Sequence, residues 1–305
     1  MRWGSSSLGI VARAGTFSIV ARDPDTLELG VAVRSHWLAV GAVVPYAQAG
    51  VGAAAVQSVP DPRTGATVMA ALADGESARD ALRRAVATTD AGMRQVGIVD
   101  ALGEAAAWTG SACIAHAGDV TGPGFSAQAN MMLRPGVPEA MAAAYAASDG
   151  PLAERLLAAL AAAEAAGGDV RGRQSAALLV VAGERDAPAT VPARVDLRVD
   201  DHADPIAELR RLWTLHRAYA LAAEADELVA QGRADEAGWR YREASALAPD
   251  RDELRFWAAL AAGVPGGVAL MRETIARDPR WRELLDRLGP DVVPAAEAMR
   301  AALDA

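Results

Sequence analysis

The sequence lacks several features that would indicate particular classes of protein. Its single cysteine, Cys113, excludes an internal disulfide and any metal site built from several cysteines. No apolar run approaches the roughly 20 residues that a membrane-spanning helix requires. Aromatic residues make up only 5% of the chain, so we expect helices that pack mainly through small side chains.

The chain is also short of positive charge. Its 30 Lys and Arg residues against 39 Asp and Glu residues give a net charge of −9, and no stretch forms a basic patch. Nucleic acids and anionic membranes attract clustered positive charge, so we expect neither as a partner. His116, His202 and His216 show no metal-ligand spacing, and we expect no metal and no cofactor. We expect a cytoplasmic protein and leave open whether it forms a homo-oligomer.

What the chain does have is enough apolar sequence for a large core. It is 52% hydrophobic over 305 residues, which suits one large and one small domain. Strands, helices, strands, helices and strands alternate up to about residue 200, which predicts two sheets packed face to face with helices outside. The strands are expected at residues 16–22, 29–33, 49–57, 94–100, 104–108, 124–131, 175–182 and 194–199. Helices are expected at 66–88, 137–147 and 151–166, with Ser77 as the N-cap of residues 78–87.

Beyond the polar residues 201–204 the pattern predicts helices only. Residues 203–231 form one long or broken helix, followed by three or four shorter ones. Gly-containing turns and two Ala/Pro-rich helix ends recur about one tetratricopeptide period apart, so residues 201–305 are predicted to be a small helical-repeat domain. Its four tryptophans, Trp213, Trp239, Trp257 and Trp281, are expected to be packing anchors.

The most informative feature is Gly15 followed by Thr16 at the mouth of the first strand. A strand-borne Thr becomes a strong nucleophile only if its own α-amino group is freed to act as the base. That requires cleavage of the Gly15–Thr16 bond or a start site that leaves Thr16 first. Three interpretations of residues 1–15 remain open: a propeptide, a disordered arm, or a gene start placed too far upstream.

Several separated segments, in the same order along the chain, resemble the bacterial and archaeal family called domain of unknown function 1028. They are residues 16–24 (TFSIVARDP), 30–37 (GVAVRSHW), 39–45 (AVGAVVP), 49–53 (AGVGA), 94–96 (RQV), 125–130 (FSAQAN) and 167–178 (GGDVRGRQSAAL). The resemblance covers roughly residues 16–200. It implies the α+β fold of the N-terminal-nucleophile hydrolases, a four-layer α-β-β-α sandwich, and family members often carry a tetratricopeptide-like helical tail. Relatives often begin Met-Thr-Phe-Ser, whereas Thr16 follows fifteen residues here.

Polar residues at strand ends and in the loop at 168–175 supply the candidate site. Alongside Thr16, the predicted catalytic residues are Asp23, Ser35, His36, Asp169 and Ser175, and the predicted substrate contacts are Arg94, Gln95, Gln128, Asn130, Arg171 and Gln174. Each also has a structural interpretation, as a turn opener, a packed histidine or a solvated strand end. The glycines at 41, 50 and 52 could place backbone N–H groups as an oxyanion hole.

These residues leave three functions open. The first is a Thr-nucleophile amidohydrolase that acts on a small amide or peptide-like C–N bond. The second is a non-catalytic ligand-binding or scaffold protein with the same fold, whose helical tail docks a partner protein. The third is hydrolysis by Ser35 with His36, which is disfavoured because adjacent strand residues point to opposite faces.

Overall fold

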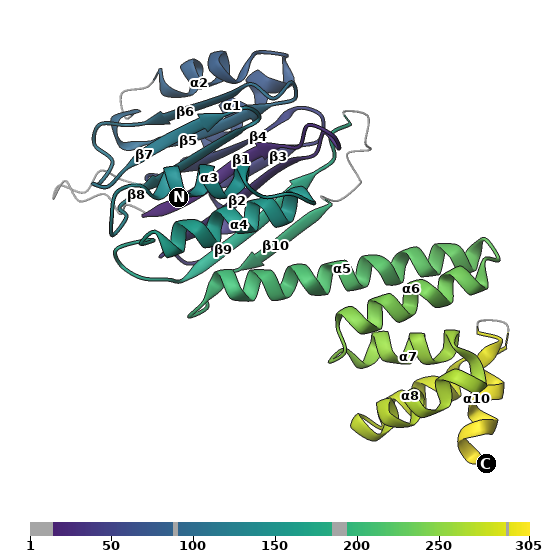
Figure 1. Ribbon diagram of the computed structural model, residues 1–305. Helices are drawn as coiled ribbons and strands as arrows, with labels where there is room; N and C mark the ends of the chain where they lie inside the picture. Colours follow the sequence, from purple (N-terminus) through teal and green to yellow (C-terminus); the bar gives the residue numbers. More distant parts are fainter. Residues whose placement is uncertain (1–14, 88–90, 185–193, 291–292) are drawn as a thin grey trace. The chain divides into compact units, whose positions relative to one another are not determined.

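The computed structural model describes residues 15–87, 91–184, 194–290 and 293–305, and it is a mixed α+β protein with two antiparallel sheets (Figure 1). Contacts divide the chain into two compact units, one ending at Arg210 and the other running from Arg211 to Ala305. Residues 1–14, which hold most of the predicted N-terminal extension, lie outside the described residues.

The larger sheet has β1 at its centre. In the described part of the chain its strand order is β10-β9-β2-β1-β8-β7, with every neighbouring pair antiparallel. The strands are β1 Thr16–Arg22, β2 Leu29–Ser35, β7 Gly118–Gly122, β8 Phe125–Asn130, β9 Ser175–Val181 and β10 Val195–Val199. Five of these agree with the sequence prediction to within two residues at each end, and β7 was not predicted.

The smaller sheet has the order β3-β4-β5-β6. Its strands are β3 Pro45–Gln48, β4 Gly52–Gln57, β5 Gln95–Asp100 and β6 Ala105–Thr109. The single strand predicted over 49–57 is wrong at its start, because residues 49–51 are a turn in which Gly50 has a φ of 61°. The predicted hairpin around residues 101–103 joins β5 to β6 and is confirmed.

Each sheet is covered by a pair of helices (Figure 1). Helices α1 (Pro62–Ala73) and α2 (Ala78–Val86) contact the smaller sheet, whereas α3 (Val137–Ala146) and α4 (Leu152–Ala165) contact the larger one. Residues 66–88 are predicted to be helical, with Ser77 as the N-cap of residues 78–87, and the structure has two helices there, separated at Gly75, which has a φ of 88°. The first helix begins at Pro62, four residues before the predicted start. The predicted N-cap is confirmed: the Ser77 hydroxyl accepts a hydrogen bond from the Asp80 N–H.

The two sheets contact each other through β1 with β4 and β5, and through β5 with β8. Side chains alternate along a strand, so one face of each strand points between the sheets. At one end that interior is apolar, with a core of Val20, Val31, Val33, Ala53, Ala55 and Val99 among others. Toward the start of β1 the same faces carry hydroxyls and amides instead. The polar end of the interior is where the candidate site lies.

The second unit is helical throughout its described residues. After α5 (Pro205–Ala230) come five shorter helices rather than three or four: α6 Ala234–Leu247, α7 Asp252–Ala261, α8 Gly263–Arg277, α9 Arg280–Arg287 and α10 Ala295–Asp304. Trp257 and Trp281 pack into its core, as predicted, and Trp213 stacks on His216. Trp239 is different, because 63% of it is exposed on α6. The prediction that it anchors packing is wrong.

Candidate active site

Thr16 is the first residue of the central strand and lies between two polar neighbours. In register it faces Ser35 of β2 on one side and Asn130 of β8 on the other, and all three residues are fully buried. The Thr16 hydroxyl donates a hydrogen bond to the Ser35 Oγ at 3.2 Å. Antiparallel pairing therefore brings together two hydroxyls that are 19 residues apart in the chain.

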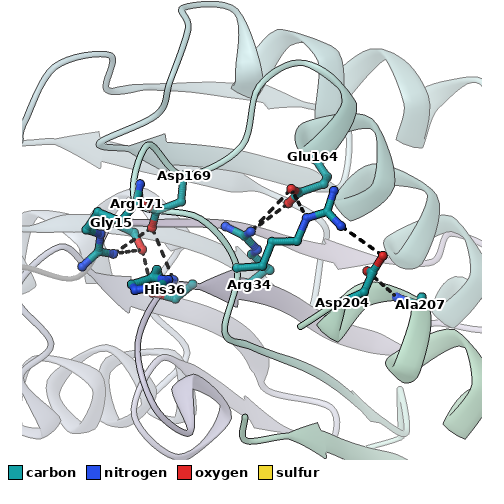
Figure 2. Close-up of polar contacts among 10 residues, drawn as sticks. Gly15, Arg34, His36, Glu164, Asp169, Arg171, Asp204 and Ala207 are labelled. Atoms are coloured by element: carbon teal, nitrogen blue, oxygen red, sulfur yellow. Dashed lines mark hydrogen bonds and ion pairs between the residues drawn. The ribbon is translucent and has the colours of Figure 1, made fainter. Parts of the chain in front are cut away.

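The carbonyl oxygen of Gly15 is held by two donors (Figure 2). The Ser35 hydroxyl donates to it at 2.6 Å, and the Arg171 Nη2 donates at 3.0 Å. One donor is neutral and the other is a cation, an arrangement that stabilises negative charge on the accepting oxygen. This carbonyl belongs to the peptide bond that joins Gly15 to Thr16.

Asp169 fixes the Arg171 guanidinium in place (Figure 2). Its two oxygens accept from the Arg171 Nε at 3.0 Å and from Nη2 at 2.7 Å, which is the bidentate geometry that gives a carboxylate–guanidinium pair its directionality. The same carboxylate accepts from the His36 backbone N–H at 3.3 Å. The Asp169 side chain is fully buried, whereas 29% of the Arg171 side chain is exposed. Asp169 therefore orients Arg171 and does not contact Thr16 in any described hydrogen bond.

The loop that carries Asp169 and Arg171 is tied down by a second group of charges (Figure 2). Glu164 of α4 accepts from Arg173 at 2.7 Å and lies 3.1 Å from Arg34, whose side chain is fully buried on β2. Arg173 also reaches Asp204 at 3.0 Å. Burial lowers the pKa of Arg34 below its ordinary value, and the opposite charge of Glu164 works against that shift. These pairs anchor both sides of the loop.

Buried amides fill the space between the sheets beside Thr16. Ser18 donates to the Gln57 Oε1 at 2.7 Å and accepts from the Gln128 Nε2 at 2.6 Å. The Gln57 amide nitrogen then donates to the Gln95 Oε1 at 2.8 Å and to the Thr16 carbonyl at 3.3 Å. Gln95 and Gln128, which are predicted as substrate contacts, thus form hydrogen bonds with other groups of the protein. Their role in the structure is to hold the strand that starts at Thr16.

Among these buried amides of the described structure, Asn130 is the one with an oxygen that accepts no hydrogen bond. Its Nδ2 donates to the Gln95 Oε1 at 2.9 Å and lies 3.5 Å from the Thr16 carbonyl. Its Oδ1 is buried and has no hydrogen-bond partner among the residues that the structure describes. Buried acceptors are rarely left unpaired. A donor that approaches Thr16 from this side would therefore find an acceptor in place.

The His36 side chain is close to the site without completing a catalytic pair. Its Nδ1 is buried and unpartnered in the described part of the chain, and only its backbone N–H contacts Asp169. Ser35 directs its hydroxyl to Gly15. The hydrogen bond between Ser35 and His36 that the third function requires is therefore not made in this structure.

Asp23 and Arg94, two of the predicted site residues, lie away from Thr16. Asp23 sits at the other end of β1, roughly 20 Å along a strand of this length, where its carboxylate accepts from two backbone N–H groups and from Arg155 at 3.1 Å. Arg94 pairs with Asp61 at 2.9 Å, at the N-cap of α1. Asp23 therefore stabilises the turn after β1, and Arg94 stabilises the N-cap residue of α1.

Ser175 and Gln174 enter β9 next to the site but serve the neighbouring loop. Ser175 accepts from the Val40 N–H at 3.2 Å and donates to the Trp37 carbonyl. The Gln174 carbonyl accepts from the His202 N–H at 2.8 Å. Ser175 pairs with Ser35 across the sheet, yet its hydroxyl is taken up by backbone groups. It stabilises the connection after β2.

The oxyanion hole predicted around glycines 41, 50 and 52 is wrong for its central part. The N–H groups of Gly50 and Val51 donate to the carbonyls of Ala182 and Gln48. Gly52 pairs with Asp100, whereas Gln57, at the other end of β4, faces Gln95 beside Thr16. The turn is therefore at the far end of the interior. The donors near Thr16 come from Ser35 and Arg171 instead.

Sequence reasoning missed Gln57 and the role of Gly15. Gln57 ends an otherwise small and apolar strand, GAAAVQ, and that abrupt polar ending was an available signal. The contact of the Gly15 carbonyl with two side-chain donors had no signal in the sequence, because a carbonyl is common to every residue. No group of three or more possible metal ligands occurs among the described residues, and none of the helices there is long and apolar enough to cross a membrane.

Known proteins match the first unit of the chain. A family model described as "Family of unknown function (DUF1028)" matches residues 16–209. The crystal structure of protein SPO2555 from Silicibacter pomeroyi, which carries the same family designation, is 38% identical with a TM-score of 0.59, and the match covers 65% of this chain and 88% of that one. No protein with a curated description matches.

Proposed function

This chain belongs to the DUF1028 family, whose function is unknown, and we propose that it is an amide hydrolase whose nucleophile is the Thr16 hydroxyl. One observation carries the proposal. The Gly15 carbonyl, in the bond that would have to be cut to free Thr16, accepts hydrogen bonds from Ser35 at 2.6 Å and Arg171 at 3.0 Å. The Thr16 hydroxyl itself contacts Ser35. The peptide bond is thus polarised beside the group that would attack it.

The proposal includes the four-layer α-β-β-α sandwich of the N-terminal-nucleophile hydrolases. It is supported by the helix pairs that cover the two sheets, α1 with α2 and α3 with α4, and by the contacts between the sheets through β1, β4, β5 and β8. Thr16 then begins a central strand at the polar end of the interior. A nucleophile in that position is held on both sides by paired strands.

The first step would be release of Thr16 from the preceding chain. The Thr16 Oγ attacks the Gly15 carbonyl carbon, the peptide C–N bond breaks, and the hydroxyl proton goes to the Thr16 nitrogen, leaving an ester. One water molecule then hydrolyses the ester to a Gly15 carboxylate and regenerates the hydroxyl. Ser35 and Arg171 stabilise the negative charge that builds on the Gly15 oxygen in both steps.

Turnover of a substrate would repeat this chemistry on an external amide. The freed α-amine of Thr16 takes the hydroxyl proton as Oγ attacks the amide carbonyl, and it returns the proton to the departing amine. Water then hydrolyses the acyl ester. Gln57 and Asn130 hold the Thr16 carbonyl, and the unpartnered Asn130 Oδ1 offers an acceptor for the α-amine. Asp169 acts as a positioning residue through Arg171.

A second candidate function is a non-catalytic ligand-binding or scaffold protein whose tetratricopeptide-like helical unit docks a partner. The observation that favours it is Trp239, which is 63% exposed and lines a hollow of α5 and α6 together with Glu227 and Glu236. Exposed aromatic residues are frequent anchors of protein interfaces. This function needs no cleavage before Thr16.

The deciding experiment is intact mass and N-terminal sequencing of protein expressed from Met1. We expect the wild-type chain to begin at Thr16, and Thr16→Ala to keep the Gly15–Thr16 bond. Thr67→Ala is the matched control, because Thr67 is only partly buried on α1 and its hydroxyl bonds only the Arg63 carbonyl in the described structure. It should mature like the wild type.

The mature chain would then be offered a panel of small amides. Turnover that Thr16→Ala abolishes, while the unfolding midpoint stays within a few degrees of the wild type, supports the hydrolase. A wild-type chain that keeps the Gly15–Thr16 bond has no free α-amine to act as base. That result contradicts the hydrolase and favours the second candidate.

A further inference from the structure

We propose that the acyl side of the Thr16 site accepts only amides whose α-carbon carries no carbon substituent, that is, glycyl or peptidyl-glycyl amides. This inference rests on the proposed function and names its substrate class. In the described structure the acyl side is occupied by Gly15, which is buried and has Asp169, Arg171 and Met131 as its nearest neighbours. The side chains around Gly15, which are those of Asp169, Arg171 and Met131 and are called the walls below, therefore set the size of the acyl group that Thr16 can attack.

A side chain at this position has no room. A Cβ built on Gly15 would lie 2.7 Å from the Asp169 Oδ2, 2.9 Å from the Arg171 Nη2 and 3.0 Å from the Met131 Cβ. Non-bonded carbon contacts favour about 3.5–4.0 Å, so each wall would have to move by several tenths of an ångström or more. The space around the Gly15 Cα therefore favours glycine at this position.

The walls are also fixed. The buried Asp169 carboxylate is held by both guanidinium contacts from Arg171 and by the His36 N–H. Moving Arg171 would break its bond to the Gly15 carbonyl, which is the bond that polarises the attacked group. The Met131 backbone is tied by its N–H to Ile114 and by its carbonyl to Val170. A Cβ could be admitted only by dismantling the donors on which the reaction depends.

The same walls should select external substrates. An external carbonyl must meet the same Oγ and the same two donors as the Gly15 carbonyl does, so its α-carbon falls where the Gly15 Cα lies now. In the chain itself the Gly15 nitrogen is acylated by the preceding residue, so an acyl group extended through that nitrogen corresponds to the chain's own substrate. Hence the site requires glycine at the cleaved carbonyl and accepts a peptide in front of it.

The test on substrates uses the mature chain from Thr16 to the C-terminus, with its helical unit. The substrates are a matched pair of aminomethylcoumarin amides, N-acetylglycyl and N-acetyl-L-alanyl. The two differ by one methyl group. We expect kcat/KM for the glycyl amide to exceed that for the alanyl amide by about 100-fold, near the upper range for one methyl in a pocket that cannot relax. Rates within about threefold of each other would overturn the proposal.

The test on the chain itself needs no external substrate. Gly15→Ala should slow the appearance of a Thr16 N-terminus by about 100-fold, measured by mass during cell-free translation. Gly266→Ala is the matched control, because a Cβ there meets nothing closer than 3.5 Å, and it should mature at the wild-type rate. Unfolding midpoints of both variants check that neither fails to fold.

The outcomes separate the two proposals. Normal maturation of Gly15→Ala overturns the glycyl requirement and leaves the hydrolase standing. Maturation blocked by Gly15→Ala supports the glycyl requirement even if the coumarin amides prove too bulky on the leaving-group side. A wild-type chain that neither matures nor hydrolyses the glycyl amide defeats the hydrolase, and the glycyl requirement with it.

Discussion

Replacing Ser35 by alanine should slow the release of Thr16 while leaving the fold intact. The variant removes the 2.6 Å hydrogen bond to the Gly15 carbonyl and the acceptor of the Thr16 hydroxyl, and it leaves the 3.0 Å bond from Arg171. Loss of one of two donors to a developing oxyanion costs about 3 kcal/mol of transition-state stabilisation, or roughly 100-fold in rate. Loss of the ground-state hydrogen bonds should cost only about 1 to 2 kcal/mol of folding free energy.

The assay follows maturation during cell-free translation. Samples are quenched at intervals, and intact mass gives the fraction of chains that begin at Thr16. Urea unfolding, followed by circular dichroism, gives the stability of each variant.

Ser175→Ala is the matched control. Ser175 lies directly opposite Ser35 in the sheet and is equally buried, but its hydroxyl serves Trp37 and Val40. It should lose a similar amount of stability and mature at the wild-type rate. If Ser35→Ala matures within about threefold of the wild type, or if both variants slow equally, the role given to the Ser35 hydroxyl is refuted.

Three further predictions concern the groups around the site. Gly97→Ala should destabilise the fold by about 3 kcal/mol in urea unfolding, because its Cβ would overlap the buried Gln128 amide; a loss below about 1 kcal/mol would contradict the packing. Arg94→Met should cost about 2 kcal/mol by the same measurement, because it removes the buried charged donor to Asp61 while the exposed Arg63 still contacts that carboxylate, and an unchanged midpoint would refute this. For Asp23, burial alone would raise the pKa, but turn N–H groups and a neighbouring arginine lower it below the ordinary value. A lowered folded-state pKa stabilises the fold above the unfolded pKa of about 3.9, and that stability is lost as pH falls through the folded value. Asp23→Asn should therefore destabilise the protein at pH 7, with the difference shrinking below about pH 4 in pH-dependent urea unfolding; a constant difference would count against it.

Local patterns predicted most of the secondary structure. β1 was predicted with its correct ends because a buried seven-residue run stops at an Asp-Pro turn, and Ser77 was recognised because an N-cap acts within one turn. The start of α1 is predicted four residues late, although Asp61 caps the helix and Pro62 is its first residue. β7 was missed because GDVTG has little strand character of its own and is an edge strand that pairs with β8 alone among the described strands.

The candidate site was predicted in part. Thr16, Ser35, Asn130, Asp169 and Arg171 were all named from the sequence, and the structure places them around one peptide bond. Their roles could not be read in advance, since roles depend on which atom faces which. Arg171 was expected to bind substrate, and it holds the Gly15 carbonyl.

The sequence alone predicts where most strands and helices of the first unit lie, although β3 and β7 are absent from that prediction. It also shows that a threonine follows a glycine at the start of a strand, and which family the chain resembles. These are properties of neighbouring residues, and short-range sterics and hydrogen bonding act on them directly. That Ser35 and Arg171 both donate to the Gly15 carbonyl, from 20 and 156 residues away in the chain, follows from the fold alone. The fold also decided that Gln57 and Gln95 bond each other, although they are 38 residues apart. Strand register and the packing of one sheet on the other set such contacts, and both depend on residues that are far apart in the chain.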